Sequence, residues 1–184
     1  MRGAESRVFP VVFLGRKMLK KERMERGYRE PALDRMLRKK RTVQEARLLN
    51  RAKKAGVSTP TVYMVEEYAL TFTKIKGRKP KMKGDEVREA AKMLAKLHKA
   101  DIVHGDYTAA NLLVNNKGMH VIDFGLGMVS QRIEDKAMDV MTMLRTLEEK
   151  ERKEFIKEYE KEWDKGKECI KRWREAEKRI RYAQ

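Results

Sequence analysis

The sequence is poor in cysteine, in proline and in long apolar segments. Its 184 residues contain four prolines, 11 glycines and one cysteine, Cys169. A single cysteine cannot form an internal disulfide, and so little Pro and Gly excludes a collagen-like or Pro/Gly-rich disordered chain. The longest apolar runs, Val11–Leu14 and Leu112–Val114, are far shorter than the ~18 residues of a membrane span. No signal-peptide pattern opens the chain, and we therefore expect a cytoplasmic protein without a membrane partner.

Basic residues are abundant and unevenly distributed. The chain has 45 Lys and Arg against 28 Asp and Glu, a formal net charge of +17. Residues 1–60 contain 18 basic and 6 acidic residues, whereas residues 121–184 contain 16 and 15. A surface generally rich in Lys, Arg and Glu would explain the mixed charges after Glu148, but not the imbalance before residue 60. The pattern favours an N-terminal third that lies close to nucleic acid.

Two β-rich stretches precede residue 76. Residues 8–21 alternate loosely and are rich in Val and Phe, which predicts two short strands joined by a tight turn at Gly15. Residues 61–65 and 68–75 predict a second hairpin, and residues 76–80 are typical of a linker.

Two helices are predicted between these hairpins. Pro31 is well placed to open a short helix. Thr42, followed three residues later by Glu45, matches a capping box and predicts the start of a second helix, which Gly56 would end.

The remainder of the chain is expected to be mainly helical. A long helix capped by Asp85 precedes a loop at 104–111, and strands are expected at 112–114 and 120–123. Another helix is expected over 135–147, and a mixed-charge helix or helix pair over 148–180. The sequence thus predicts an α+β protein of two lobes. These are a basic, β-rich N-lobe (1–76) and a reduced helical C-lobe (77–170), followed by a basic C-terminal tail (171–184).

Three separate segments carry residue types suited to phosphate and magnesium. A phosphoryl-transfer site needs a cation for the α- and β-phosphates, a carboxylate to fix it, metal ligands, and a carboxylate that orients the attacking oxygen. The sequence offers each part. The cation is Lys21 and the carboxylate that fixes it is Glu45; Asn111 and Asp123 are the metal ligands, and Asp106 is the carboxylate that orients the attacking oxygen. Asp106 and Asn111 share one loop, and the following hairpin should return the chain so that Asp123 lies opposite them. We expect the five side chains to meet around one nucleotide.

Two plainer interpretations of these residues stay open. Glu45 could serve only as the capping-box acceptor for Thr42, and the strand register could present Lys20 in place of Lys21. His104 is expected to orient its loop through hydrogen bonds and not to transfer a proton.

With these motifs in view, the chain resembles the small atypical protein-kinase-like subunits of the KEOPS (EKC) complex, which are relatives of the RIO kinases. The resemblance runs from about Gly3 to the tail, and its central segment is the most specific. It is carried by Gly3–Phe9, Lys21–Arg23, Gly27–Arg29, Pro31, Leu33–Asp34, Arg41–Arg47, His104–Thr108, Asn111, Ile122–Leu126 and Glu134–Lys136.

The resemblance implies a minimal, two-lobed protein-kinase-like fold that binds ATP. Lys21 would contact the α- and β-phosphates and pair with Glu45, and Asp106 would be the catalytic carboxylate. Asn111 and Asp123 would hold Mg²⁺ or Mn²⁺.

Further positions take their roles from the resemblance alone. Asp139 would hydrogen-bond the catalytic-loop backbone from a C-lobe helix, and Leu113 would pack beneath the adenine. The other nucleotide contacts implied, in the phosphate loop and then the hinge, are Gly3, Ala4, Glu5, Ser6, Val8, Thr73, Lys74 and Ile75.

The departures from the kinase pattern concern the protein substrate. There is no complete G-x-G-x-x-G, a His-Gly-Asp stands where typical kinases have His-Arg-Asp, and no Ala-Pro-Glu follows Asp123. Thr108 occupies the place of a phosphate-contacting Lys, and Thr73-Lys74 replaces residues expected to be acidic. The parts that act on ATP are present, whereas a platform for a peptide substrate is largely missing.

The function implied is that of an ATPase or atypical Ser/Thr kinase subunit that supports threonylcarbamoyladenosine formation in tRNA. The expected partners are KEOPS subunits. These include the threonylcarbamoyl-transferase subunit at the C-lobe and tail, a small regulatory subunit on the N-lobe, and tRNA at the basic N-terminal third. The tail lacks a Gly-Arg continuation after Arg181. The alternatives are a stand-alone RIO-like Ser/Thr protein kinase and a non-catalytic RNA-binding scaffold with a kinase fold.

Overall fold

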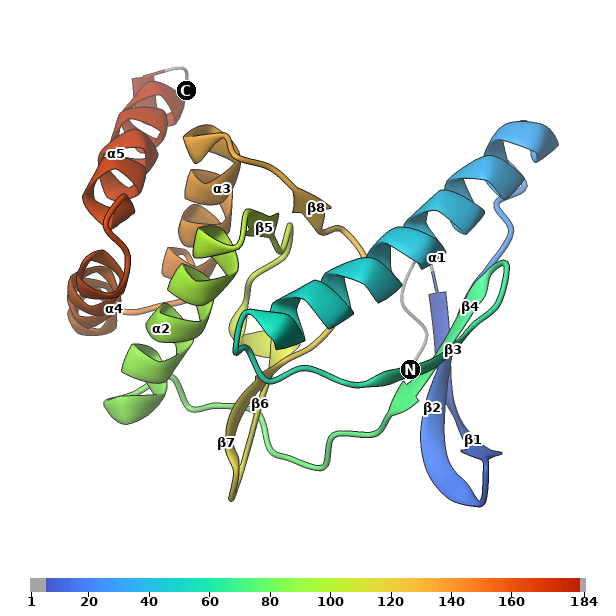
Figure 1. Ribbon diagram of the computed structural model, residues 1–184. Coiled ribbons are helices and arrows are strands. Elements are labelled where there is room, and N and C mark those ends of the chain that lie inside the picture. The colour runs from blue at the N-terminus through green and yellow to red at the C-terminus, as the bar shows by residue number, and fades with distance from the viewer. Residues whose placement is uncertain (1–5, 183–184) are drawn as a thin grey trace.

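A computed structural model describes residues 6–182, with side chains as far as Lys178. The chain forms a four-stranded sheet crossed by one long helix, and a second, mainly helical part beside them (Figure 1). Gly3, Ala4 and Glu5, which the resemblance places in the phosphate loop, lie outside the described residues.

The N-terminal sheet is antiparallel with the strand order β1-β2-β4-β3. The first hairpin matches the prediction, with its turn at Leu14 and Gly15. Both turn residues have positive φ, 49° and 71°, which suits a two-residue hairpin turn because its twist follows that of the strands. The strands are β1 (Ser6–Phe13), β2 (Arg16–Arg23), β3 (Val62–Val65) and β4 (Ala69–Thr73).

One helix, α1 (Pro31–Lys54), replaces the two that the sequence predicted. Thr42 lies inside it, and its hydroxyl donates to the Arg38 carbonyl at 2.9 Å instead of capping a new helix. The prediction of a capping box was wrong, because Thr42 is followed and preceded by good helix formers and no Gly or Pro interrupts the run. The cap lies at Glu30, whose carboxylate accepts the N–H groups of Ala32 and Leu33.

The end of α1 is where the sequence predicts it. Gly56 has φ 76°, and its N–H donates to the Lys53 carbonyl. The N–H of Val57 donates to the Ala52 carbonyl at 3.0 Å. This pair of bonds is a Schellman motif, which needs a left-handed residue at the position of Gly56.

The second part contains four helices and two small antiparallel sheets among the described residues, β5-β8 and β6-β7. Asp85 does not cap its helix; Gly84 occupies the cap position, and Glu86 accepts the N–H groups of Lys81 and Met82 at 2.6 and 3.1 Å. The elements are α2 (Asp85–Lys99), β5 (Ile102–Val103), the 3-10 turn η1 (Ala109–Asn111), β6 (Leu112–Asn115), β7 (Gly118–Val121), β8 (Met128–Val129), α3 (Ile133–Leu144), α4 (Glu149–Glu162) and α5 (Gly166–Tyr182).

The two C-terminal helices form a pair, one of the two arrangements that the sequence left open. Helix α4 packs on α2, and α5 packs on α3 (Figure 1). Ile170 and Trp173 are buried in this packing. The predicted boundary between the C-lobe and the tail, after residue 170, therefore falls inside α5. None of the described helices is long and apolar enough to span a bilayer.

The hydrophobic core joins the two parts. Leu48, Leu49 and Ala52 from the second half of α1 belong to the same buried cluster as α2, α3 and α4. The predicted linker also contacts the second part, because Arg78 exchanges two backbone hydrogen bonds with Val114 on β6. Helix α1 is therefore anchored in the helical part while its first half extends along the sheet (Figure 1).

Gly56→Ala should lower the free energy of unfolding by about 1–2 kcal/mol, because an L side chain is strained at positive φ. A Cβ at Gly56 would meet nothing within 4 Å, so the loss measures backbone strain alone. Urea unfolding followed by circular dichroism would measure it. Gly27→Ala is the control, since its φ is not left-handed and its Cβ is equally unobstructed; equal stabilities of the two variants would contradict the motif.

Candidate active site

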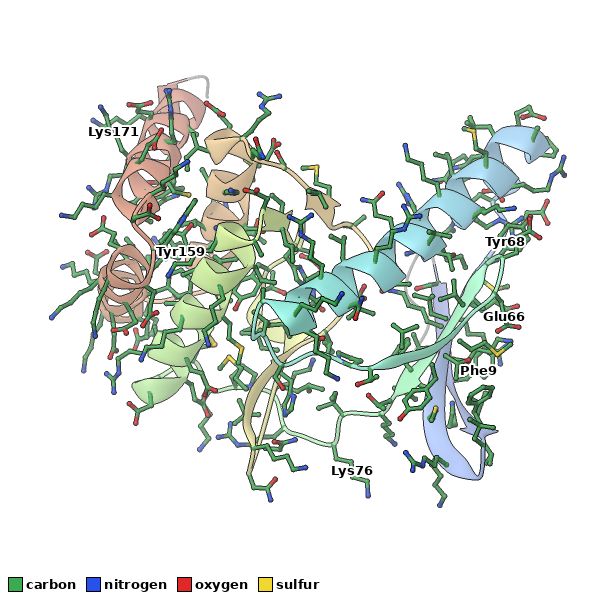
Figure 2. All side chains as sticks on the ribbon, in the orientation of Figure 1. Phe9, Glu66, Tyr68, Lys76, Tyr159 and Lys171 are labelled. Atoms are coloured by element: carbon green, nitrogen blue, oxygen red, sulfur yellow. The ribbon has the colours of Figure 1, made fainter. Side chains whose placement is uncertain are left out.

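A buried ion-pair group connects the sheet with α1. Lys21 on β2 places its Nζ 2.7 Å from Glu45 Oε1, and Arg23, two residues further along the same strand face, donates to Glu45 Oε2 at 2.6 Å. All three side chains are less than 10% exposed. Alternation along β2 sends Lys20 to the opposite side, where it pairs with Glu66 (labelled in Figure 2). The register thus brings Lys21, and not Lys20, to Glu45.

Lys21 also reaches the second part of the molecule. Its Nζ lies 2.7 Å from Asp123 Oδ1, across 102 positions of sequence. Glu45 therefore pairs with two cations, Lys21 and Arg23, and Lys21 pairs with two carboxylates, Glu45 and Asp123. Charges held this far from water are costly unless each has close partners, so the three elements that carry these residues are fixed relative to one another.

Asp123 occupies a strained turn and faces partly outward. Its φ is 64°, and the N–H of Gly125 donates to Asp123 Oδ1 at 3.1 Å. Burial alone would raise the pKa of Asp123, but the Lys21 ammonium and the Gly125 N–H together lower the pKa below its usual value. The side chain is half exposed, so an ionised carboxylate is presented at the surface of the site. Phe124 is buried, with its ring centroid 4.7 Å from that of His104.

Asp106 and Asn111 are in direct contact. The Asn111 amide donates to the Asp106 carboxylate at 2.8 Å and to the Asp106 carbonyl at 2.9 Å. These two bonds use the amide hydrogens and leave the carbonyl oxygen Oδ1 as an acceptor. The N–H of Ile122 donates to the Asn111 carbonyl at 3.0 Å, which holds the residue before Asp123 against this loop. The hairpin return predicted from the spacing is therefore present.

Asp139 on α3 hydrogen-bonds the backbone of the loop that carries Asp106, as the resemblance implied. Its two oxygens accept the N–H groups of His104 and Gly105 at 2.6 and 2.8 Å. Asp139 is itself buried on α3. The loop backbone is thereby fixed through groups that do not face the site.

His104 orients the loop through both ring nitrogens. Its Nε2 lies 3.1 Å from the Ile122 carbonyl, and its Nδ1 lies 3.3 Å from the Asp106 N–H. These partners require a proton on Nε2 and none on Nδ1. Burial lowers the pKa of His104, against the opposing effect of the Asp139 carboxylate. A neutral ring in this tautomer suits a positioning role.

His98 is a residue of this network that the sequence reasoning missed. Its Nε2 lies 3.3 Å from Asp139 Oδ2, and its Nδ1 lies 2.5 Å from the hydroxyl of Tyr159 (labelled in Figure 2). Burial lowers the pKa of His98, and burial raises the pKa of the Cys169 thiol, 3.4 Å from the Tyr159 hydroxyl, to about 11, so both are neutral at pH 7. The sequence signal that could have indicated this role is the position of His98, directly after Leu97 of the apolar stripe of α2.

Gly105 explains why the chain has His-Gly-Asp. Its φ is 81°, and a Cβ there would collide with the backbone carbonyl of Leu126. A larger residue could not occupy this place without moving the segment after Asp123. The departure from the usual motif is thus a packing requirement of this loop.

The remaining predicted nucleotide contacts lie on β1, at the end of β4 and on β6. Val8 pairs with Lys21 across β1 and β2, and Ser6 lies at the start of β1. Thr73 ends β4, where its hydroxyl accepts the Thr61 N–H at 2.9 Å. Lys74 is exposed, and Ile75 and Leu113 are partly buried.

Comparison with known proteins places the chain in a family. A model of the RIO domain matches residues 13–159. The chain is 33% identical over 207 residues to "KEOPS complex subunit Bud32" of Pyrococcus abyssi, covering 98% of this chain and 94% of that protein. It is 36% identical over 177 residues to the "Probable bifunctional tRNA threonylcarbamoyladenosine biosynthesis protein" of Methanosarcina acetivorans. That match covers 92% of this chain but 32% of the relative, so the chain spans about a third of the bifunctional protein.

The fold is kinase-like. The crystal structure of the Rio2 kinase–ADP/Mg²⁺–phosphoaspartate complex from Chaetomium thermophilum superimposes with a TM-score of 0.66, at 14% identity, over 100% of this chain and 70% of that chain. The predicted α+β, two-lobed, kinase-like fold is confirmed.

Glu45→Gln should lower the free energy of unfolding by about 3 kcal/mol, because it leaves Lys21 and Arg23 buried with too little negative charge. Chemical denaturation would measure the loss. Adding Arg23→Met should restore part of it by removing one of the two cations. Glu66→Gln is the control: it removes the partner of Lys20 at a more exposed site and should cost less than about 1 kcal/mol. Equal losses would show that Glu45 is not the buried centre of this group.

Gly105→Ala should lower the free energy of unfolding by at least about 2 kcal/mol, through positive φ and the collision with the Leu126 carbonyl. Hydrogen exchange should show the loss of protection at the N–H groups of His104 and Gly105 that Asp139 accepts. Normal stability and protection in this variant would contradict the packing requirement.

Proposed function

The chain belongs to the RIO domain family, and we propose on this basis that it is an ATP-hydrolysing, magnesium-dependent, kinase-like subunit of a cytoplasmic tRNA-modifying assembly. The observation that carries the proposal is the position of Lys21, whose Nζ lies 2.7 Å from both Glu45 and Asp123. Phosphoryl transfer depends on positioning and on neutralising charge, and this arrangement fixes a cation beside an ionised carboxylate.

The residues present fit a magnesium nucleotide. Asp123 is ionised and half exposed, and Asn111 keeps a carbonyl oxygen available, so both offer the oxygen ligands that Mg²⁺ or Mn²⁺ takes. When bound, the cation would neutralise charge that develops on the γ-phosphate. Lys21 would hold the α- and β-phosphates, and Glu45, itself held by Arg23, would keep the Lys21 ammonium in place.

Asp106 would act on the attacking oxygen. The Asn111 amide restrains its carboxylate at 2.8 Å, and Asp139 restrains the loop backbone. A carboxylate held in this way can orient a water or a hydroxyl toward the γ-phosphate. Around the nucleotide we place Ser6 and Val8 at the phosphates, the backbone of Thr73–Ile75 at the adenine edge, and Leu113 beneath the ring.

The segment after Gly125 is short, and this favours hydrolysis of ATP over transfer of phosphate to a peptide. Residues 126–132 alone separate it from α3, and within them β8 pairs with β5. The N–H of Ser130 donates to the Asp101 carbonyl at 2.9 Å, and its hydroxyl donates to Asp135 at 2.6 Å. A segment so short and so well bonded leaves little surface for a peptide substrate.

The partners are proposed from the relatives and the charge distribution. The Pyrococcus relative is named a KEOPS subunit, and the Methanosarcina relative contains the matching region within one longer, bifunctional chain. Fusion in a relative supports a stable contact between this chain and a threonylcarbamoyl-transferase subunit, for which we propose the C-lobe and α5. We place a small regulatory subunit on the N-lobe and tRNA at the basic residues 1–60.

Asp123→Ala should reduce ATP hydrolysis at least a hundredfold, because it removes a metal ligand and a group that neutralises charge in the transition state. Release of inorganic phosphate should be measured for the chain alone, with a transferase partner, and with tRNA. Asp164→Ala removes an equally small but exposed carboxylate and should leave hydrolysis unchanged. Unchanged turnover in Asp123→Ala would refute the site.

The same assays separate the alternatives. Radiolabel from γ-labelled ATP that appears on a protein hydroxyl, faster than phosphate is released with partners present, would identify a stand-alone Ser/Thr kinase. ATP binding without turnover, with partner and tRNA supplied, would identify a non-catalytic scaffold.

A further inference from the structure

A surface groove of about 670 Å³ lies between α1 and β8. The two elements are in contact, and Figure 1 shows β8 beside α1. The nucleotide site proposed above does not use this groove, because Lys21, Asp106 and Asp123 are not among its lining residues. The groove is therefore a second surface feature, formed by one element from each part of the molecule.

Part of the lining is apolar. On the α1 side, Leu48 is buried and Val43 is partly buried. On the other side, Met128 and Val129 of β8 are 39% and 55% exposed. Leu126, two residues before β8, is exposed as well. Large apolar side chains that lie together at a surface are typical of a site that a partner covers.

The rest of the lining, apart from Gln44, is basic and exposed. It consists of four residues of α1: Lys39, Lys40, Arg47 and Arg51. Lys39 also pairs with Glu67 at 3.5 Å, and Arg51 interacts electrostatically with Asp101. Lys40 and Arg47 form no ion pair within the described part of the chain. No carboxylate is among the described residues that line the groove, so these two cations are available to a negatively charged partner.

The basic and apolar side chains share one face of α1. Intervals of three and four residues separate Lys40, Val43, Arg47 and Arg51, and such intervals place side chains on one side of a helix. A partner lying along this face would meet a cation and an aliphatic group within two turns.

An acidic, amphipathic protein segment matches both properties of the lining. We propose that the groove docks such a segment of a partner subunit, with its apolar side chains on Val43, Leu48 and β8 and its carboxylates beside Lys40 and Arg47. An apolar centre with a charged border is the usual anatomy of a protein interface, and complementary charge selects the partner. The inference rests on the proposed function in one respect, namely that the chain works within an assembly.

Other occupants fit the groove less well. Single-stranded RNA is bound by cations together with aromatic side chains on which its bases stack, and no aromatic residue is among the described lining residues. A second copy of the chain is opposed by charge, since each copy carries +17 and a symmetric contact would place one basic groove against another. The basic residues outside the groove stay the proposed place of tRNA.

The groove is joined to the candidate active site through Gln44. The Gln44 side chain lines the groove, and its amide donates to the carbonyl of Gly127, just before β8. The next residue, Glu45, holds Lys21 at 2.7 Å, and Gly127 follows Asp123 by four positions. A segment bound to both α1 and β8 would thus restrain the two carboxylates that hold the Lys21 ammonium.

The test is the affinity of the full chain for the other subunits of the proposed assembly, each titrated separately by calorimetry. Arg47→Glu reverses a lining cation, and Val129→Asp places a charge in the apolar part of the groove. Each should weaken binding of the subunit that supplies the segment at least about tenfold. Arg47→Lys and Val129→Ile are the matched controls, because they keep the charge and the apolar surface, and both should bind within about threefold of the wild type.

Hydrogen exchange locates the contact independently. The bound subunit should slow exchange at the amides of Met128 and Val129 in the wild type and in Arg47→Lys. Thermal unfolding of the free variants shows that they are folded, as expected for substitutions of exposed side chains.

Three results would overturn the docking site. The first is equal affinity of Arg47→Glu and the wild type for every subunit that binds. The second is a loss of tRNA affinity in Arg47→Glu with subunit binding unchanged, which would mark an RNA groove. The third is a dimer of the wild type, seen by sedimentation, that Val129→Asp dissociates. If no subunit binds the wild type at all, the proposed assembly is refuted and the docking site with it, so the two failures are distinguishable.

Discussion

The ammonium of Lys21 is held between two carboxylates that come from different parts of the chain. Glu45 approaches it from α1 and Asp123 from the turn after β7, each at 2.7 Å. Because a buried charge is stable only with its partners in place, this contact fixes the position of α1 against the sheet and of the sheet against the helical part. Lys21 and Glu45 from the N-terminal part are thereby aligned with Asp123 from the C-terminal part.

A second buried carboxylate, Asp139, holds the loop that carries Asp106 in place, as Glu45 holds the Lys21 ammonium. Asp139 accepts two loop N–H groups and is itself approached by His98, which contacts Tyr159 on α4. The loop that carries Asp106 is thus held by residues of α2, α3 and α4. In both places the group that would touch the nucleotide is oriented by a residue that does not touch it, which keeps the reacting groups in place without occupying the site.

Two buried carboxylates organise part of the positive charge in the first third of the chain. Asp34, in the first turn of α1, pairs with Arg29 and Arg38, and Glu45, further along the helix, pairs with Lys21 and Arg23. These ion pairs join α1 to β2 and to the connection between them.

The sequence by itself predicted most of the strands and helices and the residue types of the candidate site. Period-two stretches predicted the sheet, Gly56 predicted the end of α1, and the spacing of Asp106, Asn111 and Asp123 predicted one shared loop and its return. Local signals failed at Thr42, where a capping-box pattern stood inside a run of good helix formers and tertiary packing continued the helix. Only the tertiary structure decided the choice of Lys21 over Lys20, the second cation on Glu45, the role of His98 and the need for glycine at 105. Each of these depends on which atoms of distant segments come within contact distance, and the spacing of residues within one segment does not determine that.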